Sequence, residues 1–355
     1  MLAFIVPNLA WGSPLDGAER RGTIVRMPSA KAIVIREPGG PEVLEVGKVD
    51  LPEPSATQVL VQVKAAGLNR ADCLQRRGFY SAPPGVPAEV PGLEFAGTIA
   101  AVGSDAGDWA VGDRVMGIVG GGGMAELVVT EGRELMQVPA SLSLEEAAAI
   151  PEAFLTAYDA IVLQGGLSTG NAVLLHAVAS GIGTAGIQLT TALGATSVGT
   201  SRTADKLERC AALGLDHPIL VDEGEFAAKV LEVVPSGIDV ILDTVGAAYL
   251  GQNVKIMAKR GRIIVIGLMG GVRGELPLGA LLAKRGSIHG SVLRSRTSDE
   301  KAELTSRFST DMLRKFEEGT LRPIIDETLP MTEVQTAHTR MDANQTFGKL
   351  VLTWA

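Results

Sequence analysis

The stretch that decides the fold is HAVASGIGTAG, residues 176–186, which places glycines at positions 181, 183 and 186. An apolar run, NAVLLHAV, leads into it, and the helix-forming run IQLTTALG follows it. Glycines at this spacing let the backbone turn tightly between a strand and a helix and approach a pyrophosphate closely. The helix N-terminus adds free N–H groups and the positive end of its dipole. The same spacing occurs in ordinary turns, but this strand–turn–helix setting predicts a dinucleotide-binding loop.

The segments after Pro151 alternate between strand and helix. TSVGTS, HPILVD, GIDVILDTVG and GRIIVIGL have the pattern of apolar strands, and the runs ADKLERCAALG, FAAKVLEVV and VKIMAKR between them have that of helices. This alternation predicts a doubly wound parallel sheet. From Lys31 to about Ile150 the runs are short and strand-like and are divided by turns rich in glycine and proline, which predicts a compact β-barrel-like unit.

A closing segment completes the division of the chain. The helical run ELTSRFSTDMLRKFEEG, the run PIIDETLPM and the strand KLVLTW follow Leu293, and we expect this tail to return to the β-rich unit. The α/β chain therefore divides into an N-terminal extension, residues 1–26, a β-rich unit formed by residues 27–152 and 294–355, and a cofactor unit, residues 153–293.

Composition excludes several kinds of partner. The 355 residues carry a formal net charge of −8, so neither nucleic acid nor an anionic membrane is an expected partner. No apolar run approaches the ~20 residues that span a bilayer. The two cysteines, Cys73 and Cys210, exclude a disulfide framework and fit a reducing compartment. We therefore predict a cytoplasmic protein, with organelle targeting by the arginines of residues 1–26 as the alternative.

The strand after the glycine loop predicts which dinucleotide binds. An NAD site places an acidic residue about 20 positions beyond the loop, where it holds the ribose 2′-hydroxyl. This chain has Thr200, Ser201 and Arg202 there, with Lys206 one turn into the next helix. Hydroxyls and two cations suit a dianionic 2′-phosphate, so we predict NADPH as the cofactor.

Several separate motifs in order make the chain similar to a known family. They are GDRVMG (112–117), AAAIPEAFLTAYDAIV (147–162), the glycine loop, VILDTVG (240–246) and VIGLMGG (265–271). Together they resemble the medium-chain dehydrogenase/reductases. NRADCLQRRGFY (69–80) and MDANQTFGKLVL (341–352) are most similar to the zinc-free quinone oxidoreductase branch, and within it to the p53-inducible type. The resemblance implies a GroES-like β-barrel catalytic domain and a Rossmann cofactor domain.

The resemblance also bears on metal binding. Zinc alcohol dehydrogenases of the superfamily carry catalytic metal on a Cys-x-x-Asp motif and a Gly-His-Glu motif. Here Asn69 and Asp72 match the ends of the first motif, and Gly92, Leu93 and Glu94 match the second. Neither asparagine nor leucine replaces a thiolate or an imidazole as a zinc ligand, so we expect no metal. Glu94 and Asp72 are expected to serve structure or to shape the site.

A site without a Lewis acid suits substrates that are reduced easily. Quinones fulfil this condition, because their reduction gives an aromatic hydroquinone, and the protein then mainly has to orient a flat acceptor. We predict NADPH-dependent reduction of quinones by hydride or one-electron transfer. The alternatives are an enone or alkenal double-bond reductase, which needs an acid to protonate carbon, and a non-catalytic NADPH-binding protein.

The family comparison implies a set of site residues. Asn69 and Tyr80 are expected beside the nicotinamide and substrate, although a turn-stabilising role and rim packing are the respective alternatives. One departure is Val221, which stands about where relatives have a tyrosine near the 2′-phosphate. The remaining expected cofactor contacts are Thr156, Ser180, Gly181, Ile182, Gly183, Val245, Gly267, Leu268, Met269, Gly270 and Asn344.

Other residues are expected to be structural. His176 ends the strand before the glycine loop and has the position of a hydrogen-bonded core residue, and Cys73 has no histidine partner that the sequence identifies. The late apolar strands GRIIVIG and SIHGSVL match edge strands through which relatives pair about a two-fold axis. An uncovered apolar edge favours self-association, so we predict a homodimer.

Overall fold

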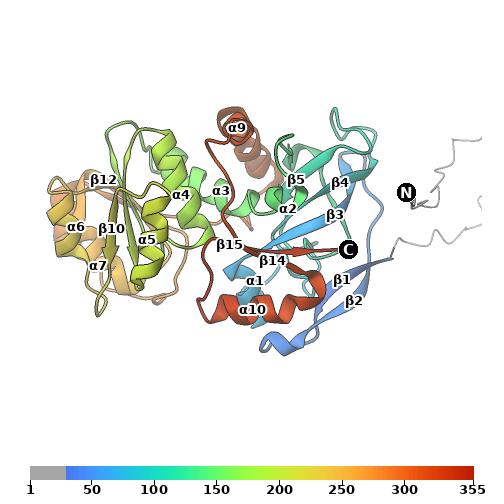
Figure 1. Cartoon of the computed structure of the whole chain (residues 1–355), viewed down its shortest axis with the longest axis horizontal. Helices are drawn as coiled ribbons and strands as arrows, with labels where there is room; N and C mark the ends of the chain where they lie inside the picture. The colour runs from blue at the N-terminus through green and yellow to red at the C-terminus, as the bar shows by residue number, and fades with distance from the viewer. Residues whose placement is uncertain (1–28) are drawn as a thin grey trace, which may run out of the picture.

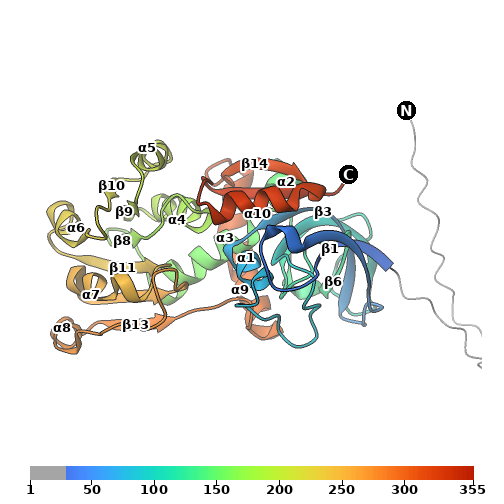
Figure 2. The ribbon, with the colours of Figure 1, turned by 90° about the horizontal axis from the view of Figure 1, so that it is seen from below.

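A computed structural model describes residues 29–355, and the predicted extension, residues 1–26, lies outside this range. In Figures 1 and 2 a parallel sheet with its helices forms one end of the molecule, a β-rich unit forms the other, and α3 lies between them. The predicted α/β fold, with a β-rich unit and a doubly wound parallel sheet, is confirmed.

The β-rich unit is built on one mixed sheet with the strand order β14-β15-β3-β4-β5-β7, and β6 pairs with β3. Strand β15 pairs antiparallel with β3, with Leu350 opposite Leu68, so the tail of the chain returns to the first unit as predicted. A separate antiparallel pair joins β1 and β2. The strands are β1 (Ser29–Ile35), β2 (Leu44–Asp50), β3 (Gln58–Leu68), β4 (Glu94–Val102), β5 (Arg114–Ile118), β6 (Leu127–Glu131), β7 (Leu135–Gln137), β14 (Ile325–Pro330) and β15 (Lys349–Thr353).

The cofactor unit contains a six-stranded parallel sheet in the order β10-β9-β8-β11-β12-β13. The order reverses direction between β8 and β11, which is where ligands of such sheets bind, at the carboxyl ends of the strands. The strands are β8 (Ala172–Leu175), β9 (Thr196–Ser201), β10 (His217–Leu220), β11 (Ile238–Asp243), β12 (Met257–Val265) and β13 (Ser287–Gly290); the helices are α4 (Gly181–Ala192), α5 (Ala204–Ala212), α6 (Ala227–Val233), α7 (Ala247–Ile256) and α8 (Leu278–Lys284).

The helices outside this sheet start at recognisable signals. Thr297 and Glu300 form a capping box at the start of α9, and Ser143 and Glu146 form another at α2. Pro151 occupies the first turn of α3, where its missing N–H costs nothing. These helices are α1 (Arg70–Arg76), α2 (Leu144–Ala147), α3 (Pro151–Ala157), which continues as a π-helix over Tyr158–Gln164, α9 (Ser298–Glu317) and α10 (Val334–Asp342); short 3-10 turns cover Pro41–Val43, Gly132–Glu134 and Met331–Glu333.

One apolar core joins the two sheets through α3. Phe154 packs edge-on against Phe316 of α9 with ring centroids 4.9 Å apart, and Tyr158 packs in the same way on Phe308. The same core contains Met116 of β5 and strand residues of β8 and β11, so α3 is packed from both sides. This shared packing fixes the parallel sheet relative to the β-rich unit. The candidate site lies where these two parts of the molecule face each other.

The prediction of a helix over VKIMAKR is wrong for its second half. Helix α7 ends at Ile256, and β12 begins at Met257, which pairs with Ile238 of β11. Ile256 and Met257 are both fully buried, so one apolar run covers the end of the helix and the start of the strand. Hydrophobic periodicity alone could not locate the boundary between them. Within residues 29–355, no helix has the length and apolar character needed to cross a membrane.

Candidate functional site

The glycine loop has the geometry of a phosphate-binding turn. Ser180 caps α4, and its Oγ accepts a hydrogen bond from the N–H of Gly183 at 3.1 Å. A Cβ on Gly183 would lie 2.3 Å from the carbonyl oxygen of Val178, and one on Gly186 would lie 2.9 Å from Leu175. Only glycine therefore fits at position 183, where the clash is with backbone, whereas a side chain at position 186 would require Leu175 to move. The loop leads directly into the N-terminus of a 12-residue helix.

A second part of the crevice follows β11 and β12. The N–H of Gly270 donates to the carbonyl of Val245 at 2.7 Å, so the loop over residues 267–270 folds onto the end of β11. A Cβ on Gly267 would lie 2.8 Å from the carbonyl oxygen of Thr244. The structure thus brings the predicted residues Val245, Gly267 and Gly270 together, whereas the side chains of Leu268 and Met269 are exposed.

Two buried hydroxyls at this crevice have no partner. The Oγ1 atoms of Thr156 on α3 and Thr244 after β11 make no hydrogen bond with any of residues 29–355. A threonine inside a helix usually bonds to its own backbone, but Thr156 does not. Buried polar atoms without partners mark places where a ligand or water completes the bonding, so this lining fits a polar cofactor.

The end of β9 carries the residues expected at a 2′-phosphate. Arg202 is exposed and makes no ion pair with the residues described, and Ser201 accepts a hydrogen bond from the N–H of Thr203 at 3.2 Å. The hydroxyl of Thr200 lies inside the sheet, 2.8 Å from Nδ1 of His176, and its carbonyl accepts from the N–H of Val178, so the predicted contact of Thr200 with a nucleotide is not supported by the structure. The other ring nitrogen of His176 lies 2.8 Å from Oδ1 of Asn253, as expected of a structural histidine.

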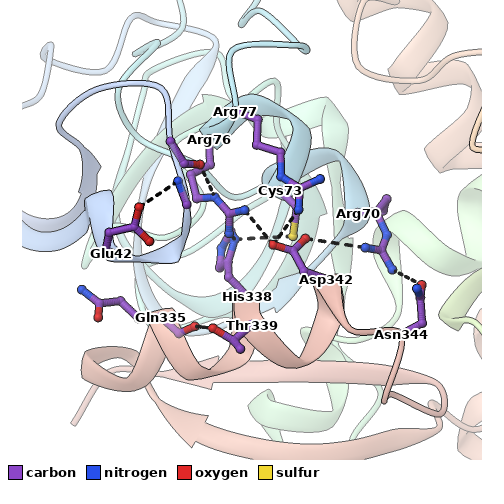
Figure 3. Close-up of polar contacts among 12 residues, drawn as sticks. Glu42, Arg70, Cys73, Arg76, Arg77, Gln335, His338, Thr339, Asp342 and Asn344 are labelled. Atoms are coloured by element: carbon purple, nitrogen blue, oxygen red, sulfur yellow. Dashed lines mark hydrogen bonds and ion pairs between the residues drawn. The ribbon is translucent and has the colours of Figure 1, made fainter.

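Asn344 connects this region to the β-rich unit. Its carbonyl accepts from Nζ of Lys206 at 2.6 Å, and its Oδ1 accepts from Arg70 at 2.8 Å. Figure 3 shows Arg70 reaching both Asn344 and Asp342. Burial lowers the pKa of Lys206. Two residues predicted to bind cofactor, Lys206 and Asn344, therefore lie together, and Arg70 joins them to the helix that follows Asn69.

At the opposite wall, a buried ion pair surrounds Asn69. Nζ of Lys349 lies 2.5 Å from Oε1 of Glu94, and both residues are almost completely buried. The ammonium group also donates to Oδ1 of Asn69 at 2.6 Å and to the carbonyl of Leu68 at 2.9 Å. The amide of Asn69 in turn donates to Glu94 at 2.9 Å and to the carbonyl of Gly67 at 3.3 Å. Asn69 is thus held in place on every side, and its predicted contact with substrate stays a prediction.

Asp72 supports this wall from α1. Its two carboxyl oxygens accept from the N–H of Asn69 at 2.8 Å and from the N–H of Gly92 at 2.9 Å. Burial nevertheless raises the pKa of Asp72 to about 6. Both polar residues of the zinc-type motifs therefore bond to protein groups, Asp72 to backbone and Glu94 to Lys349.

Tyr80 lies beside a buried arginine. The guanidinium carbon of Arg294 stands 4.7 Å from the centre of the Tyr80 ring, and Arg294 donates to the carbonyl of Tyr80 at 3.0 Å. Arg294 is 5% exposed and is held further by Gln75 and Gly120. Burial raises the pKa of the Tyr80 phenol, which keeps it protonated. The phenol makes no hydrogen bond with the residues described, so it is free to donate one.

Glu152, at the second position of α3, completes the charged groups of the wall. Its N–H donates to Oε2 of Glu94 at 2.8 Å, and no described residue donates to its own carboxyl group. Burial, followed by the charge of Glu94, raises the pKa of Glu152 to about 8. The residue as a whole is partly exposed, although burial of the carboxyl is the main cause of its raised pKa.

Cys73 has a histidine partner that the sequence did not reveal. Its Sγ lies 3.4 Å from Nδ1 of His338, and Arg76 also approaches that nitrogen, at 3.1 Å (Figure 3). Burial and the nearby charge of Asp342 raise the pKa of the Cys73 thiol to about 12. Burial lowers the pKa of His338 to about 3. A neutral imidazole and a protonated thiol make this pair a structural contact between α1 and α10.

Comparisons with known proteins agree with this architecture. Residues 55–140 match the family described as "Alcohol dehydrogenase GroES-like domain", and residues 181–310 match "Zinc-binding dehydrogenase". Human quinone oxidoreductase is 31% identical over 326 residues, which are 91% of this chain and 97% of that protein. The chain belongs to the medium-chain dehydrogenase/reductase superfamily. Within it, quinone oxidoreductases are relatives of this chain over nearly its whole length.

Solved structures of this superfamily superpose on almost all of the chain. A quinone oxidoreductase of Pseudomonas syringae pv. Tomato DC3000 has a TM-score of 0.82 at 29% identity and covers 92% of this chain and 100% of its own. An NAD-dependent alcohol dehydrogenase has a TM-score of 0.81 at 34% identity with the same coverage. The CurK enoyl reductase has a TM-score of 0.80 at 26% identity, covering 91% and 99%.

Sequence reasoning missed three residues of this medium-chain reductase site: Lys349, Arg294 and Glu152. Lys349 is the first residue of an apolar strand, where a buried charge needs a partner of opposite charge. This feature of the sequence could have indicated that Lys349 forms an ion pair. Glu152 lies within a quoted family motif, but its environment depends on Glu94, which is 58 positions away. Arg202 lies close enough to Tyr249 to influence its pKa, which burial raises, whereas Val221 is buried in the core.

Replacement of Lys349 by methionine should destabilise the protein strongly. The change leaves Glu94 as a buried charge without its cation, a loss that costs about 3–5 kcal/mol in other proteins. Thermal unfolding is the measurement, and the exposed Lys48→Met variant is the control. Adding Glu94→Gln to Lys349→Met should restore part of the loss. Equal melting temperatures for Lys349→Met and Lys48→Met would show that the ion pair does not hold this wall.

Both thiols should be unreactive in the native protein. Cys73 and Cys210 are buried, and burial also raises the pKa of Cys210, to about 11. Titration with a chromogenic disulfide reagent at neutral pH should detect no thiol in the folded protein and both after denaturation. Fast reaction of Cys73 in the folded state, identified with a Cys73→Ser variant, would contradict the structural role of its contact with His338.

Proposed function

We propose that this medium-chain reductase uses NADPH to reduce quinones in the crevice between the parallel sheet and the β-rich unit. The observation that carries the proposal is the wall formed by Asn69, Glu94 and Lys349, in which Lys349 bonds to Asn69 and Glu94, two residues at positions that match the zinc-type motifs. A substrate at such a wall must accept electrons without a Lewis acid, and quinones do so readily.

The ammonium group of Lys349 argues against a metal at this wall. It lies within 2.6 Å of both the Asn69 oxygen and Glu94 Oε1, the oxygens that a cation would use. A divalent ion there would have to displace a buried, fully bonded positive charge. Among residues 29–355 no three histidine, cysteine or acidic side chains are grouped for metal binding, which is compatible with a zinc-independent reductase.

The choice of NADPH over NADH rests on the residues at the end of β9. Ser201, Arg202 and Lys206 offer a hydroxyl and two cations where an NAD site has a carboxylate. A structural neighbour is named as an NAD-dependent alcohol dehydrogenase, so fold similarity alone does not select the nucleotide. The orphan hydroxyls of Thr156 and Thr244 would bind polar groups of the cofactor, and the first turn of α4 would bind its pyrophosphate. When bound, NADPH would supply the hydride.

Tyr80 and Arg294 are suited to the charge that appears on a reduced quinone. The Tyr80 phenol has no other partner among the described residues, and its raised pKa keeps its proton available for a hydrogen bond. Arg294 adds a buried positive charge beside the ring. Donors that are already fixed in place stabilise a developing oxyanion without reorganising.

A second candidate function is reduction of a double bond next to a carbonyl. The neighbouring CurK structure is named an enoyl reductase, and Glu152 provides an acid that could protonate carbon, as such a reaction requires. Direct comparison of quinone and enone substrates distinguishes the two. A protein that binds NADPH tightly but reduces neither substrate would be the non-catalytic alternative.

We also propose a cytoplasmic homodimer that forms through the edge of the parallel sheet. Strand β13 ends that sheet, and Figure 2 shows β13 and α8 together at its outer side. Helix α8 has no buried residue, and Leu278 and Leu282, one turn apart, are 67% and 80% exposed. A second copy covering this edge would bury both leucines and pair the free side of β13.

Oxidation of NADPH and NADH with 1,4-benzoquinone and 1,2-naphthoquinone tests the main proposal. We expect turnover that favours NADPH and is unaffected by a chelator.

Arg202→Glu should raise the KM for NADPH by about tenfold or more, because one charge-assisted contact is replaced by repulsion. Glu208→Gln on the outer side of α5 is the control. Equal use of both nucleotides would contradict the assignment of Arg202, and absence of quinone turnover would contradict the substrate.

Leu282→Glu tests the proposed dimer. The Leu282 side chain is exposed in the single chain, so the variant should still fold. Its melting temperature should equal that of the unmodified protein at protein concentrations low enough to keep the unmodified protein monomeric. Sedimentation velocity should find a dimer for the unmodified protein and a monomer for Leu282→Glu, because charge at a buried contact opposes association. Val111→Glu, at an exposed position outside α8 and β13, should stay dimeric. A monomeric unmodified protein would refute the dimer.

A further inference from the structure

Glu152 shares a helix face with a residue of the cofactor crevice. It stands one turn before Thr156 on α3, and residues four apart on a helix are neighbours, roughly 6 Å apart at their Cβ atoms. Thr156 carries one of the two orphan hydroxyls of the crevice. The bond from the Glu152 N–H to Glu94 Oε2 fixes the Glu152 backbone beside the buried wall of Asn69, Glu94 and Lys349. Glu152 also lies near enough to Tyr80 and Arg294 for their charges to interact with its own.

The charges around Glu152 favour a bound proton. The groups that influence it are Glu94 on β4, Asp72 on α1, Lys349 on β15 and Arg294 in the segment after β13. The positive charge of Lys349 is already matched by Glu94 in a 2.5 Å pair. Arg294 is bonded to Gln75 and to backbone carbonyls. A second carboxylate would therefore stand beside Glu94 with no cation and no hydrogen-bond donor of its own among the described residues.

We propose that Glu152 is the acid that protonates the substrate as it is reduced, in place of solvent. This inference rests on the proposed function. A bound reduced dinucleotide would supply the hydride, and Glu152 would supply the proton that completes reduction of the quinone. The carboxyl O–H bond breaks, an O–H bond forms on the reduced oxygen, and the resulting carboxylate takes a new proton from water. Its pKa of about 8 keeps the carboxyl protonated at neutral pH and close to the value at which general acids work best.

The experiment compares the unmodified protein with Glu152→Gln and Glu152→Asp. Turnover of NADPH with 1,2-naphthoquinone is measured from roughly pH 6 to pH 10, because this range brackets the pKa of such an acid. The unmodified enzyme should lose kcat/KM as the pH rises through the pKa of Glu152, since only the protonated acid donates. Glu152→Gln should be about 100-fold slower at neutral pH and should lack this fall. Glu152→Asp should keep a pH-dependent fall and part of the activity. Glu145→Gln, a partly exposed acid on α2, should match the unmodified protein.

Two further measurements separate a proton donor from a structural residue. Infrared titration without cofactor should show a carboxyl group that ionises near the pKa of Glu152 and is missing in Glu152→Gln. The affinity for NADPH, followed by its fluorescence, should be equal in both proteins. An active unmodified enzyme with Glu152→Gln of equal rate and equal pH profile would overturn the role of Glu152 and leave the proposed function intact. An unmodified protein that binds NADPH but reduces no quinone would overturn the proposed function and this role with it.

Discussion

The buried pair of Lys349 and Glu94 is the constraint on which the site depends. It joins the last strand of the chain to β4, and through Asn69 it fixes the start of α1. The stem of Lys349 also packs on the phosphate loop, since a Cβ on Gly181 would lie 2.5 Å from Lys349 Cδ. Burying an ion pair is costly unless its remaining donors and acceptors are bonded, and here the ammonium has three acceptors. One side chain therefore couples the glycine loop to the wall around Asn69.

This arrangement also determines the protonation of its neighbours. The positive charge of Lys349 balances the carboxylate of Glu94. Asp72 and Glu152 lie in the same region without a cation of their own within residues 29–355. Backbone N–H groups solvate Asp72, and burial still raises its pKa to about 6. Glu152 lacks such donors among the described residues, and its pKa rises further, to about 8. The difference between two nearby acids follows from the hydrogen bonds available to each, which is how proteins produce acids with different functions.

Local signals in the sequence were sufficient for the fold and for the phosphate loop. Gly183 and Gly186 meet neighbours a few residues away, so their spacing carries the geometry directly. Contacts between distant segments were not predictable in this way. Lys349 and Glu94 are 255 positions apart, and Cys73 and His338 are 265 apart. Thr200 shows the same limit, since its position in β9 was predictable but the direction of its hydroxyl, toward His176, was set by the packing of the sheet.

Asn69 and Leu93, at positions that match zinc-type motifs, are not zinc ligands by their chemistry, and this bears on what the neighbouring residues would have to do. A metal would stabilise negative charge on a substrate oxygen and would lower the need for an acid. Under the proposed metal-free function, the wall offers a phenol, a buried guanidinium and a carboxyl of raised pKa, contributed by Tyr80, Arg294 and Glu152. Each of these groups can interact with an oxygen that becomes negative, whereas none can polarise a simple ketone as strongly as a divalent cation. The proposed function therefore requires acceptors that are already electron-poor, and within that proposal the raised pKa of Glu152 takes over part of the role of a metal.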